Sequence, residues 1–380
     1  MNPSYSDILD TLRAEGNFRR IPEESPAGAE FVDLSSNDYL GLGARADLRE
    51  RFFTDMARSP LPMTSSASRL LSGRQREYDS LENLLARLYG RPCLLFNSGY
   101  HANTGMMQAL ATGRTLIVAD RLVHASIIDG ITLSKAPFTR FRHNDLDHLE
   151  KILAKEAAAH DRVLIVVESV YSMDGDRADI RRLAEIKRRF PNTILYVDEA
   201  HAFGVEGPQG LGLALESGCF GDVDVVMGTF GKACASFGAF CAVSPLLRDY
   251  LVNRARSLIF STSLPPASVA WTQFMVETFL GMDAERGHLR TLGERLQSHL
   301  QPLSPRFPVT ASHIQPLVIG SARQTVTLSE KLRENGFKVL PIRTPTVPPG
   351  TERLRISLSA ALQLSDIDRL GDLLSKLMTE

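Results

Sequence analysis

Residues 194–201 read ILYVDEAH, and residues 223–232 read VDVVMGTFGK. In each stretch an apolar, strand-like run ends directly at polar and ionisable side chains, which are Asp198 and His201 in the first and Thr229 and Lys232 in the second. Buried parallel strands read as continuous apolar runs because helices cover both faces of their sheet. Open sheets of this kind bind ligands at the carboxyl ends of their strands. The two stretches therefore predict an α/β fold with a ligand site at one edge of its sheet.

Helix and strand patterns alternate around these stretches. A leucine-rich face predicts a helix over residues 77–89, and a helix over 180–189 joins two apolar runs as a βαβ crossover. The expected strands lie at 31–34, 93–96, 115–119, 138–141, 163–167, 194–197 and 237–244. Beyond them the pattern is helical over 265–280 and 283–300, then mixed, with strands at 315–319, 338–342 and 353–359 and helices at 325–335 and 365–378.

This organisation predicts three parts. An N-terminal arm (1–43) is expected to pack with a small C-terminal α+β domain (281–380), and a large domain (44–280) is expected to hold a mainly parallel central sheet. The chain has 380 residues, which is enough for two domains.

Composition limits the classes of function. The formal net charge of −1 provides no overall field that favours nucleic acid or an anionic membrane. Residues 1–20 contain no apolar signal core, and the longest apolar runs are too short to span a bilayer. The four cysteines are widely scattered, which predicts neither a disulfide framework nor a metal site. We therefore expect a cytoplasmic protein that binds neither nucleic acid nor membrane.

The polar residues at the strand ends fit the requirements of a pyridoxal 5'-phosphate (PLP) site. Such a site needs a lysine that holds the cofactor as an imine and an acid that faces the pyridinium nitrogen. Asp198 could be that acid, but an aspartate after a strand is equally typical of a helix N-cap. Lys232 lies among small and apolar residues, where desolvation makes a lysine amine a nucleophile, although most lysines are solvated surface charges. His201 could bind the phenolic oxygen or could be structural.

Three further stretches follow expected strands. Gly99 and Tyr100 begin a helix whose N–H groups could bind the phosphate together with Thr229, although Ser-Gly turns are common. His124 follows the strand at 115–119 and could lie over the pyridine ring or cap the next helix. Ser172 follows the strand at 163–167 and could donate to the cofactor hydroxyl. The combination points to PLP more strongly than any single member does.

Several motifs resemble those of the PLP-dependent α-oxoamine synthases, which belong to the fold-type I aminotransferase-like superfamily. The resemblance rests on SSNDYLGLG (35–43), DRLVHASIIDG (120–130), ESVYSMDGD (168–176), VDEAHAFGVEGPQGLG (197–212), GTFGKA (228–233) and FSTSLPPA (260–267). It implies a homodimer with the active site at the subunit interface. Matched by motif, the cofactor residues are Gly99, Tyr100, Ser172, Asp198, His201, Thr229, Lys232 and, toward the neighbouring subunit, Thr262.

The resemblance also implies how substrates bind. His124 would stack on the ring, and Arg355 would bind the amino-acid carboxylate together with Asn37. Arg19 and Thr346 match positions near the acyl donor. The catalytic residues are expected to be Lys232, His124 and Asp198.

IQPLVIG (314–320) and PIRTPTVPPGTERLRISLSA (341–360) favour the branch of the family that condenses L-alanine with a pimeloyl thioester in biotin biosynthesis. The thiol is coenzyme A or an acyl carrier protein. A glycine-using sister synthase and a catalytically silent partner subunit remain alternatives. The chain departs from the glycine-rich pattern of the family at TSSASRLL (64–71) and ACASFG (233–238), which could reshape the acyl channel.

Overall fold

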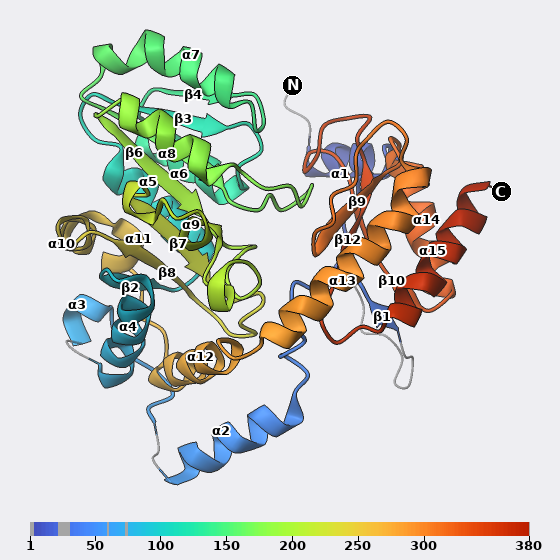
Figure 1. The fold of residues 1–380 in the computed structure, drawn as a ribbon, viewed down its shortest axis with the longest axis horizontal. Coiled ribbons are helices and arrows are strands. Elements are labelled where there is room, and N and C mark those ends of the chain that lie inside the picture. The colour runs from blue at the N-terminus through green and yellow to red at the C-terminus, as the bar shows by residue number, and fades with distance from the viewer. Residues whose placement is uncertain (1–3, 22–30, 59–60, 73–74, 380) are drawn as a thin grey trace. The chain divides into compact units, whose positions relative to one another are not determined.

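The described residues of this computed structural model, which are 4–21, 31–58, 61–72 and 75–379, form two compact units (Figure 1). The sheet unit lies within residues 40–172 and 177–286, and the terminal unit lies within residues 1–39, 173–176 and 287–380. Residues 1–3 and 22–30 of the expected N-terminal arm lie outside the described residues. The three domain ranges expected from the sequence stay predictions, because compactness alone does not show that a part folds independently.

The sheet unit is built on a seven-stranded sheet in the order β2-β8-β7-β6-β5-β3-β4 (Figure 1). Neighbouring strands from β7 to β4 are parallel, whereas β8 runs antiparallel to both β2 and β7. The expected mainly parallel central sheet is therefore confirmed. The strands are β2 (Cys93–Phe96), β3 (Thr115–Asp120), β4 (Phe138–Phe141), β5 (Arg162–Glu168), β6 (Thr193–Asp198), β7 (Val225–Thr229) and β8 (Ala239–Val243).

The central strands are apolar because both of their faces are covered. Every residue of β3 is buried, and all of β5 is buried except Arg162. Leu164 and Val166 alternate along one face of β5 and pack in a core that also contains Met106 of α5 and Ile127 of α6. Burying one such side chain fully is worth about 1.5–3 kcal/mol, so this core fixes the order of the strands and the position of their ends.

Helices connect the strands of the sheet unit. They are α2 (Ala46–Arg58), α3 (Arg69–Ser72), α4 (Arg76–Tyr89), α5 (Gly99–Leu110), α6 (Ala125–Ser134), α7 (Leu146–Glu156), α8 (Ile180–Arg189), α9 (Leu213–Glu216), α10 (Pro245–Arg254), α11 (Arg256–Ile259) and α12 (Pro266–Phe279). The sequence pattern does not predict α2, α7 or α10. Of these, α10 buries only Leu251 and has no apolar stripe by which a helix is read from sequence, whereas α2 carries one at Leu48, Phe52 and Met56 that the pattern reading missed.

The terminal unit contains two small sheets. β1 (Val32–Asp33) pairs in parallel with β10 (Phe337–Lys338), while β12 (Arg353–Ser357) lies between β11 (Leu340–Ile342) and β9 (Ile314–Val318). The single strand expected at 338–342 is therefore wrong, because the two halves of that segment belong to different sheets. The helices of this unit are α1 (Tyr5–Ala14), α14 (Ala322–Glu334) and α15 (Leu364–Thr379), and α13 (Asp283–Leu300) contains the boundary at Gly287.

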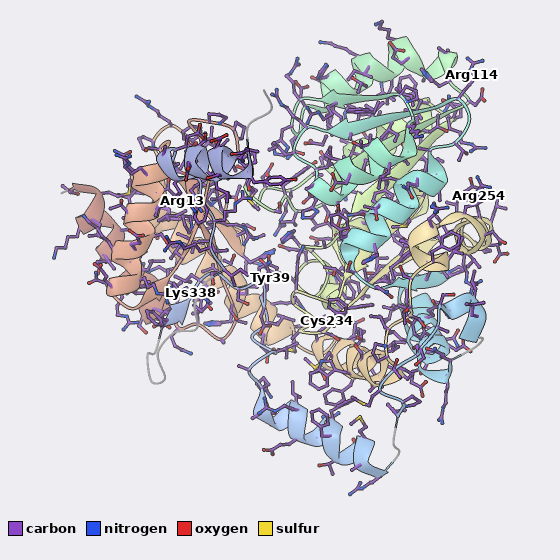
Figure 2. The ribbon with its side chains drawn as sticks, turned by 180° about the vertical axis from the view of Figure 1, so that it is seen from behind. Arg13, Tyr39, Arg114, Cys234, Arg254 and Lys338 are labelled. Carbon is purple, nitrogen blue, oxygen red and sulfur yellow. The ribbon has the colours of Figure 1, made fainter. Side chains whose placement is uncertain are left out.

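All four cysteines are free, and three of them are buried, including Cys234 (Figure 2). Among the described residues, we find no helix with the length and apolar character needed to cross a bilayer.

Gly228 in β7 provides a test of this packing. A Cβ atom at Gly228 would overlap the ring of Phe240 on the neighbouring strand β8. Gly228→Ala should therefore lower the free energy of unfolding by about 1–3 kcal/mol, as overpacking of a core does. Gly221→Ala is the matched control, because a Cβ atom there meets no atom within 4 Å. Urea unfolding of both variants checks this, and equal stabilities would contradict the described packing of β7 on β8.

Candidate active site

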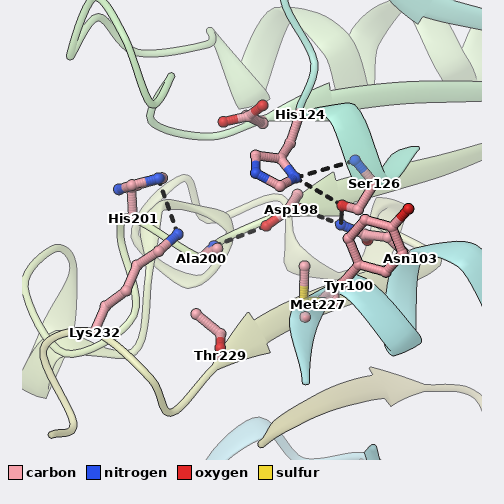
Figure 3. Close-up of a pocket in the computed structure, with 12 residues that line it drawn as sticks. Tyr100, Asn103, His124, Ser126, Asp198, Ala200, His201, Met227, Thr229 and Lys232 are labelled. Atoms are coloured by element: carbon pink, nitrogen blue, oxygen red, sulfur yellow. Dashed lines mark hydrogen bonds between the residues drawn. The ribbon is translucent and has the colours of Figure 1, made fainter. Parts of the chain in front are cut away.

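A cavity of about 180 Å³ lies at the carboxyl end of the sheet, entirely within the sheet unit (Figure 3). Its walls come from the ends of β5, β6 and β7, from the first turns of α5 and α6, and from the turns that follow β6 and β7. The lining residues are Gly99, Tyr100, Asn103, His124, Ser126, Glu168, Asp198, Ala200, His201, Met227, Thr229 and Lys232. Seven of the residues predicted from the sequence are thus brought to one site.

Asp198 ends β6 and is only 3% exposed. Its Oδ1 accepts from the backbone N–H of Ala200 at 2.9 Å, and its Oδ2 accepts from Nδ2 of Asn103 at 2.9 Å (Figure 3). A buried carboxylate is stable in its charged form only where donors replace the lost water. These two N–H donors supply that replacement on both oxygens.

Asn103 is oriented by a second contact. The hydroxyl of Tyr196 donates to Oδ1 of Asn103 at 2.6 Å, so the amide nitrogen faces Asp198. The same Nδ2 also donates to Oγ of Ser126 at 2.9 Å. Asn103, Ser126 and Tyr196 are all buried, and each of these polar groups is therefore satisfied inside the protein.

His124 is linked to the same network. Its Nδ1 lies 2.7 Å from Oγ of Ser126 and accepts from the backbone N–H of Ser126 at 3.2 Å. His124 therefore caps α6, which is one of the two roles predicted for it from the sequence. Because Nδ1 is an acceptor here, the ring proton of the neutral imidazole lies on Nε2. Burial lowers the pKa of His124, which favours that neutral form.

Lys232 and His201 meet on another side of the cavity. Nζ of Lys232 lies 2.9 Å from Nε2 of His201 (Figure 3). Both residues follow strand ends, His201 after β6 and Lys232 after β7. Parallel pairing of β6 with β7 therefore brings an imidazole and an amine together across a sequence separation of 31 residues.

Gly99 and Thr229 form a third side. Gly99 is the first residue of α5, and a Cβ atom there would lie 3.7 Å from Cβ of Thr229. The free N–H groups at the start of a helix attract anions, and the hydroxyl of Thr229 lies beside them. Tyr100 is half exposed and donates from its hydroxyl to Oδ2 of Asp129 at 2.5 Å.

The other predicted site residues do not line this cavity. Ser172 is buried in the sheet unit, and Thr262 is exposed there, with its backbone carbonyl accepting from Nδ2 of Asn97 at 2.7 Å. Arg19, Asn37, Thr346 and Arg355 belong to the terminal unit.

Within the terminal unit the four predicted residues form two pairs. A guanidinium nitrogen of Arg355 donates to Oδ1 of Asn37 at 3.1 Å, and that oxygen also accepts from the hydroxyl of Tyr39 at 2.9 Å. Arg19 donates to the hydroxyl of Thr346 at 3.0 Å. The structure therefore joins two residues of the N-terminal segment to residues more than 300 positions later in the chain.

The sequence interpretation assigned no role to Asn103, Ser126 and Glu168, which also line the cavity. Glu168 carried the same signal as Asp198, since it is the last residue of an apolar strand. Asn103 lies one helical turn after Gly99 and is a polar side chain on a largely buried helix. Ser126 carried no signal that separates it from an ordinary residue in the first turn of a helix.

The chemical groups that line the cavity fit PLP. An amine can hold the aldehyde carbon, a buried carboxylate with its own N–H donors can face a pyridinium nitrogen, and a helix start with a threonine can bind a phosphate. All three groups open into one cavity of the sheet unit.

Comparisons with known proteins agree with this site. Residues 29–374 match the family model described as aminotransferase class I and II. A Pasteurella multocida protein, whose name gives 8-amino-7-oxononanoate synthase as its proposed activity, is 47% identical over 373 residues and 96% of each chain. The resemblance drawn from the motifs is confirmed.

Solved structures show the same fold. Serine palmitoyltransferase from Sphingomonas wittichii aligns with a TM-score of 0.87 and 29% identity over 97% of each chain. The 8-amino-7-oxononanoate synthase from Francisella tularensis aligns with a TM-score of 0.78 and 26% identity, over 92% of this chain and 98% of that one. A serine palmitoyltransferase structure that contains PLP also aligns over 97% of the chain. The predicted fold type I and the predicted cofactor are both confirmed. The chain therefore belongs to the α-oxoamine synthases, PLP-dependent acyltransferases within the aminotransferase class I and II family.

Proposed function

We propose that this protein condenses L-alanine with a pimeloyl thioester to give 8-amino-7-oxononanoate, CO2 and the free thiol, a step of biotin biosynthesis. One observation carries the chemistry: the amine of Lys232 opens into the same cavity as the carboxylate of Asp198, which two N–H groups hold. The choice of substrates is supported by the proposed activity of the Pasteurella multocida relative.

When bound, PLP supplies an electron sink for the electron pair left at Cα of the amino acid. Lys232 would hold the cofactor, and its free amine would take the Cα proton of alanine as a general base. Asp198 would keep the ring nitrogen protonated, and His124 would lie over the ring. His201 and Ser172 would donate to the phenolic oxygen. Gly99, Tyr100 and Thr229 would hold the phosphate end, with Thr262 contributed by a neighbouring subunit.

Residues of the terminal unit would bind the substrates. Arg355 with Asn37 would bind the alanine carboxylate, because a guanidinium pairs with a carboxylate through two parallel hydrogen bonds. Arg19 and Thr346 would bind the acyl donor. The new C–C bond joins Cα of alanine to the acyl carbonyl carbon while the C–S bond breaks. Cα then loses the carboxylate as CO2, and a proton takes its place.

A second candidate is a sister α-oxoamine synthase with another amino acid. The high structural similarity to serine palmitoyltransferase shows that the fold accepts more than one substrate pair. A glycine-using enzyme with an acetyl or succinyl donor was the alternative expected from the sequence. A catalytically silent subunit is the candidate of another class, and the complete set of Lys232, Asp198 and His201 argues against it.

The proposal includes an assembly and a location. We expect a homodimer, because the motif match assigns the exposed Thr262 to a cofactor site, yet Thr262 does not line the cavity of its own sheet unit. We also expect a cytoplasmic enzyme whose pimeloyl donor is bound to coenzyme A or to an acyl carrier protein.

Replacing Lys232 by alanine tests the covalent role. Lys232→Ala should abolish turnover, and borohydride treatment of the holoenzyme should no longer fix PLP to the peptide that contains residue 232. Lys135→Ala is the control, because Lys135 is exposed and does not line the cavity. Mass spectrometry of the digested protein reads the result, and a fully active Lys232→Ala variant would refute the role.

A substrate panel tests the reaction. The purified holoenzyme should release 8-amino-7-oxononanoate and CO2 from L-alanine and pimeloyl-CoA, and should give no comparable product with glycine or serine or with acetyl, succinyl or palmitoyl donors. Product analysis by mass spectrometry with labelled amino acids checks this. A preference for glycine or serine would favour a sister synthase, and a protein that binds no PLP would favour the silent subunit.

Variants of Asn103 test whether its amide group stabilises the carboxylate of Asp198. Asn103→Ala removes the donor at Oδ2 of Asp198 and should weaken PLP binding by about 10-fold, as loss of a hydrogen bond to a charged group does. Asn103→Asp replaces the donor by a like charge and should weaken binding further. PLP titration of the apoenzyme at neutral pH checks the order. If Asn103→Asp bound PLP as tightly as wild type, the carboxylate of Asp198 would not depend on this contact.

A further inference from the structure

The turn between β7 and β8 (residues 230–238), which carries Lys232, contains a strained residue. Ala235 has a φ of +44°, in the left-handed region that residues other than glycine adopt only at an energetic cost. Its backbone N–H donates to the carbonyl of Lys232 at 2.8 Å, and the N–H of Ser236 donates to the carbonyl of Phe230 at 2.9 Å. Ala235 therefore lies where the chain folds back on the segment that carries the lysine. A strained backbone persists only where surrounding contacts hold it.

Helix α12, in the same sheet unit, supplies such contacts. The indole N–H of Trp271 donates to the carbonyl of Ala235 at 3.2 Å. The hydroxyls of Ser236 and Thr272 lie 2.7 Å apart. Since the Thr272 hydroxyl donates to the carbonyl of Ser268 at 2.9 Å, Ser236 is the donor of that pair. Two consecutive residues of α12 thus hold the two consecutive residues at which the turn folds back.

The indole ring of Trp271 is itself held by packing. It meets the ring of Phe52 in α2 edge to face, with the ring centroids 5.0 Å apart. The ring of Phe274 lies on it with the centroids 5.6 Å apart. These contacts keep the indole N–H directed at the carbonyl of Ala235.

We propose that Trp271 is a positioning residue for Lys232: its indole N–H keeps the turn in the left-handed conformation that presents the lysine amine to the cavity. That amine lines the cavity and lies 2.9 Å from Nε2 of His201, and a reacting group loses much of its effect when it is displaced. A glycine in place of Ala235 would adopt the conformation freely, whereas the alanine of this chain needs the contact. The inference rests on the proposed role of Lys232 in holding PLP, but not on the choice of substrates.

Two ligands separate the position of the amine from the shape of the cavity. PLP bonds covalently to a lysine, whereas pyridoxamine 5'-phosphate has an amine in place of the aldehyde and cannot. Trp271→Phe keeps an aromatic ring beside Phe52 and removes the N–H. Titration of the apoenzyme at neutral pH should show PLP binding weakened about 5-fold, the effect of one lost hydrogen bond, and pyridoxamine 5'-phosphate binding unchanged. Phe274→Leu is the matched control, because it alters the same aromatic cluster, and it should bind both ligands as wild type does.

A second substitution tests whether Trp271 acts through Ala235. Ala235→Gly removes the steric cost of the left-handed conformation, so the turn no longer depends on the indole N–H. Added to Trp271→Phe, it should restore PLP affinity to within about 2-fold of wild type. If Trp271 only filled space in the core, Ala235→Gly would not compensate for its loss.

Three results would overturn the proposal: wild-type PLP affinity in Trp271→Phe, an equal loss of affinity for both ligands, or no recovery on adding Ala235→Gly. If thermal unfolding shows that Trp271→Phe does not fold, Ala235→Val decides, since it leaves the indole in place and makes the left-handed conformation costlier. It should weaken the binding of PLP alone, and wild-type binding of both ligands would overturn the proposal. A wrong role for Lys232 would appear instead in the borohydride experiment on the wild-type protein, and a failed substrate panel affects none of these outcomes.

Discussion

The burial of an ionised carboxylate at the end of β6 is the constraint on which the site depends. Asp198 has lost nearly all of its water, and the N–H groups of Asn103 and Ala200 replace it. Asn103 can serve only if its amide nitrogen faces Asp198, and the hydroxyl of Tyr196 fixes that orientation from within the same strand as Asp198. The need to stabilise this one buried charge therefore explains the positions of Asn103 in α5, of Ala200 in the turn after β6 and of Tyr196 in the core.

The same amide connects the two residues proposed to contact the cofactor ring. Through Ser126, Asn103 is linked to Nδ1 of His124, so the imidazole and the carboxylate are held by one network of buried polar groups (Figure 3). Networks of this kind are stable when every member is satisfied.

The sequence predicted those parts of the fold and site that follow from local pattern. Apolar runs identified β5, β6 and β7, and polar residues after β6 and β7 identified Asp198, His201 and Lys232, because parallel strands bring their ends to one edge. The split between β10 and β11 could not be read, since β10 pairs with β1 at the other end of the chain, whereas β11 pairs with the next strand, β12. Asn103 and Ser126 were missed for a similar reason: their importance arises from contacts with Asp198 and His124 that exist only after α5 and α6 have packed. Motif resemblance placed Arg355 and Asn37 together, and the structure gives the hydrogen bond that joins them.

The central claim is that Asp198 sets the protonation of the cofactor ring. It is tested most directly by the ¹⁵N chemical shift of the ring nitrogen, measured on the holoenzyme reconstituted with ¹⁵N-labelled PLP and on Asp198→Asn. The account predicts a protonated ring nitrogen in the wild-type protein at neutral pH and an unprotonated one in Asp198→Asn, whose amide cannot balance a positive charge. A ring nitrogen with the same shift in both proteins would contradict it.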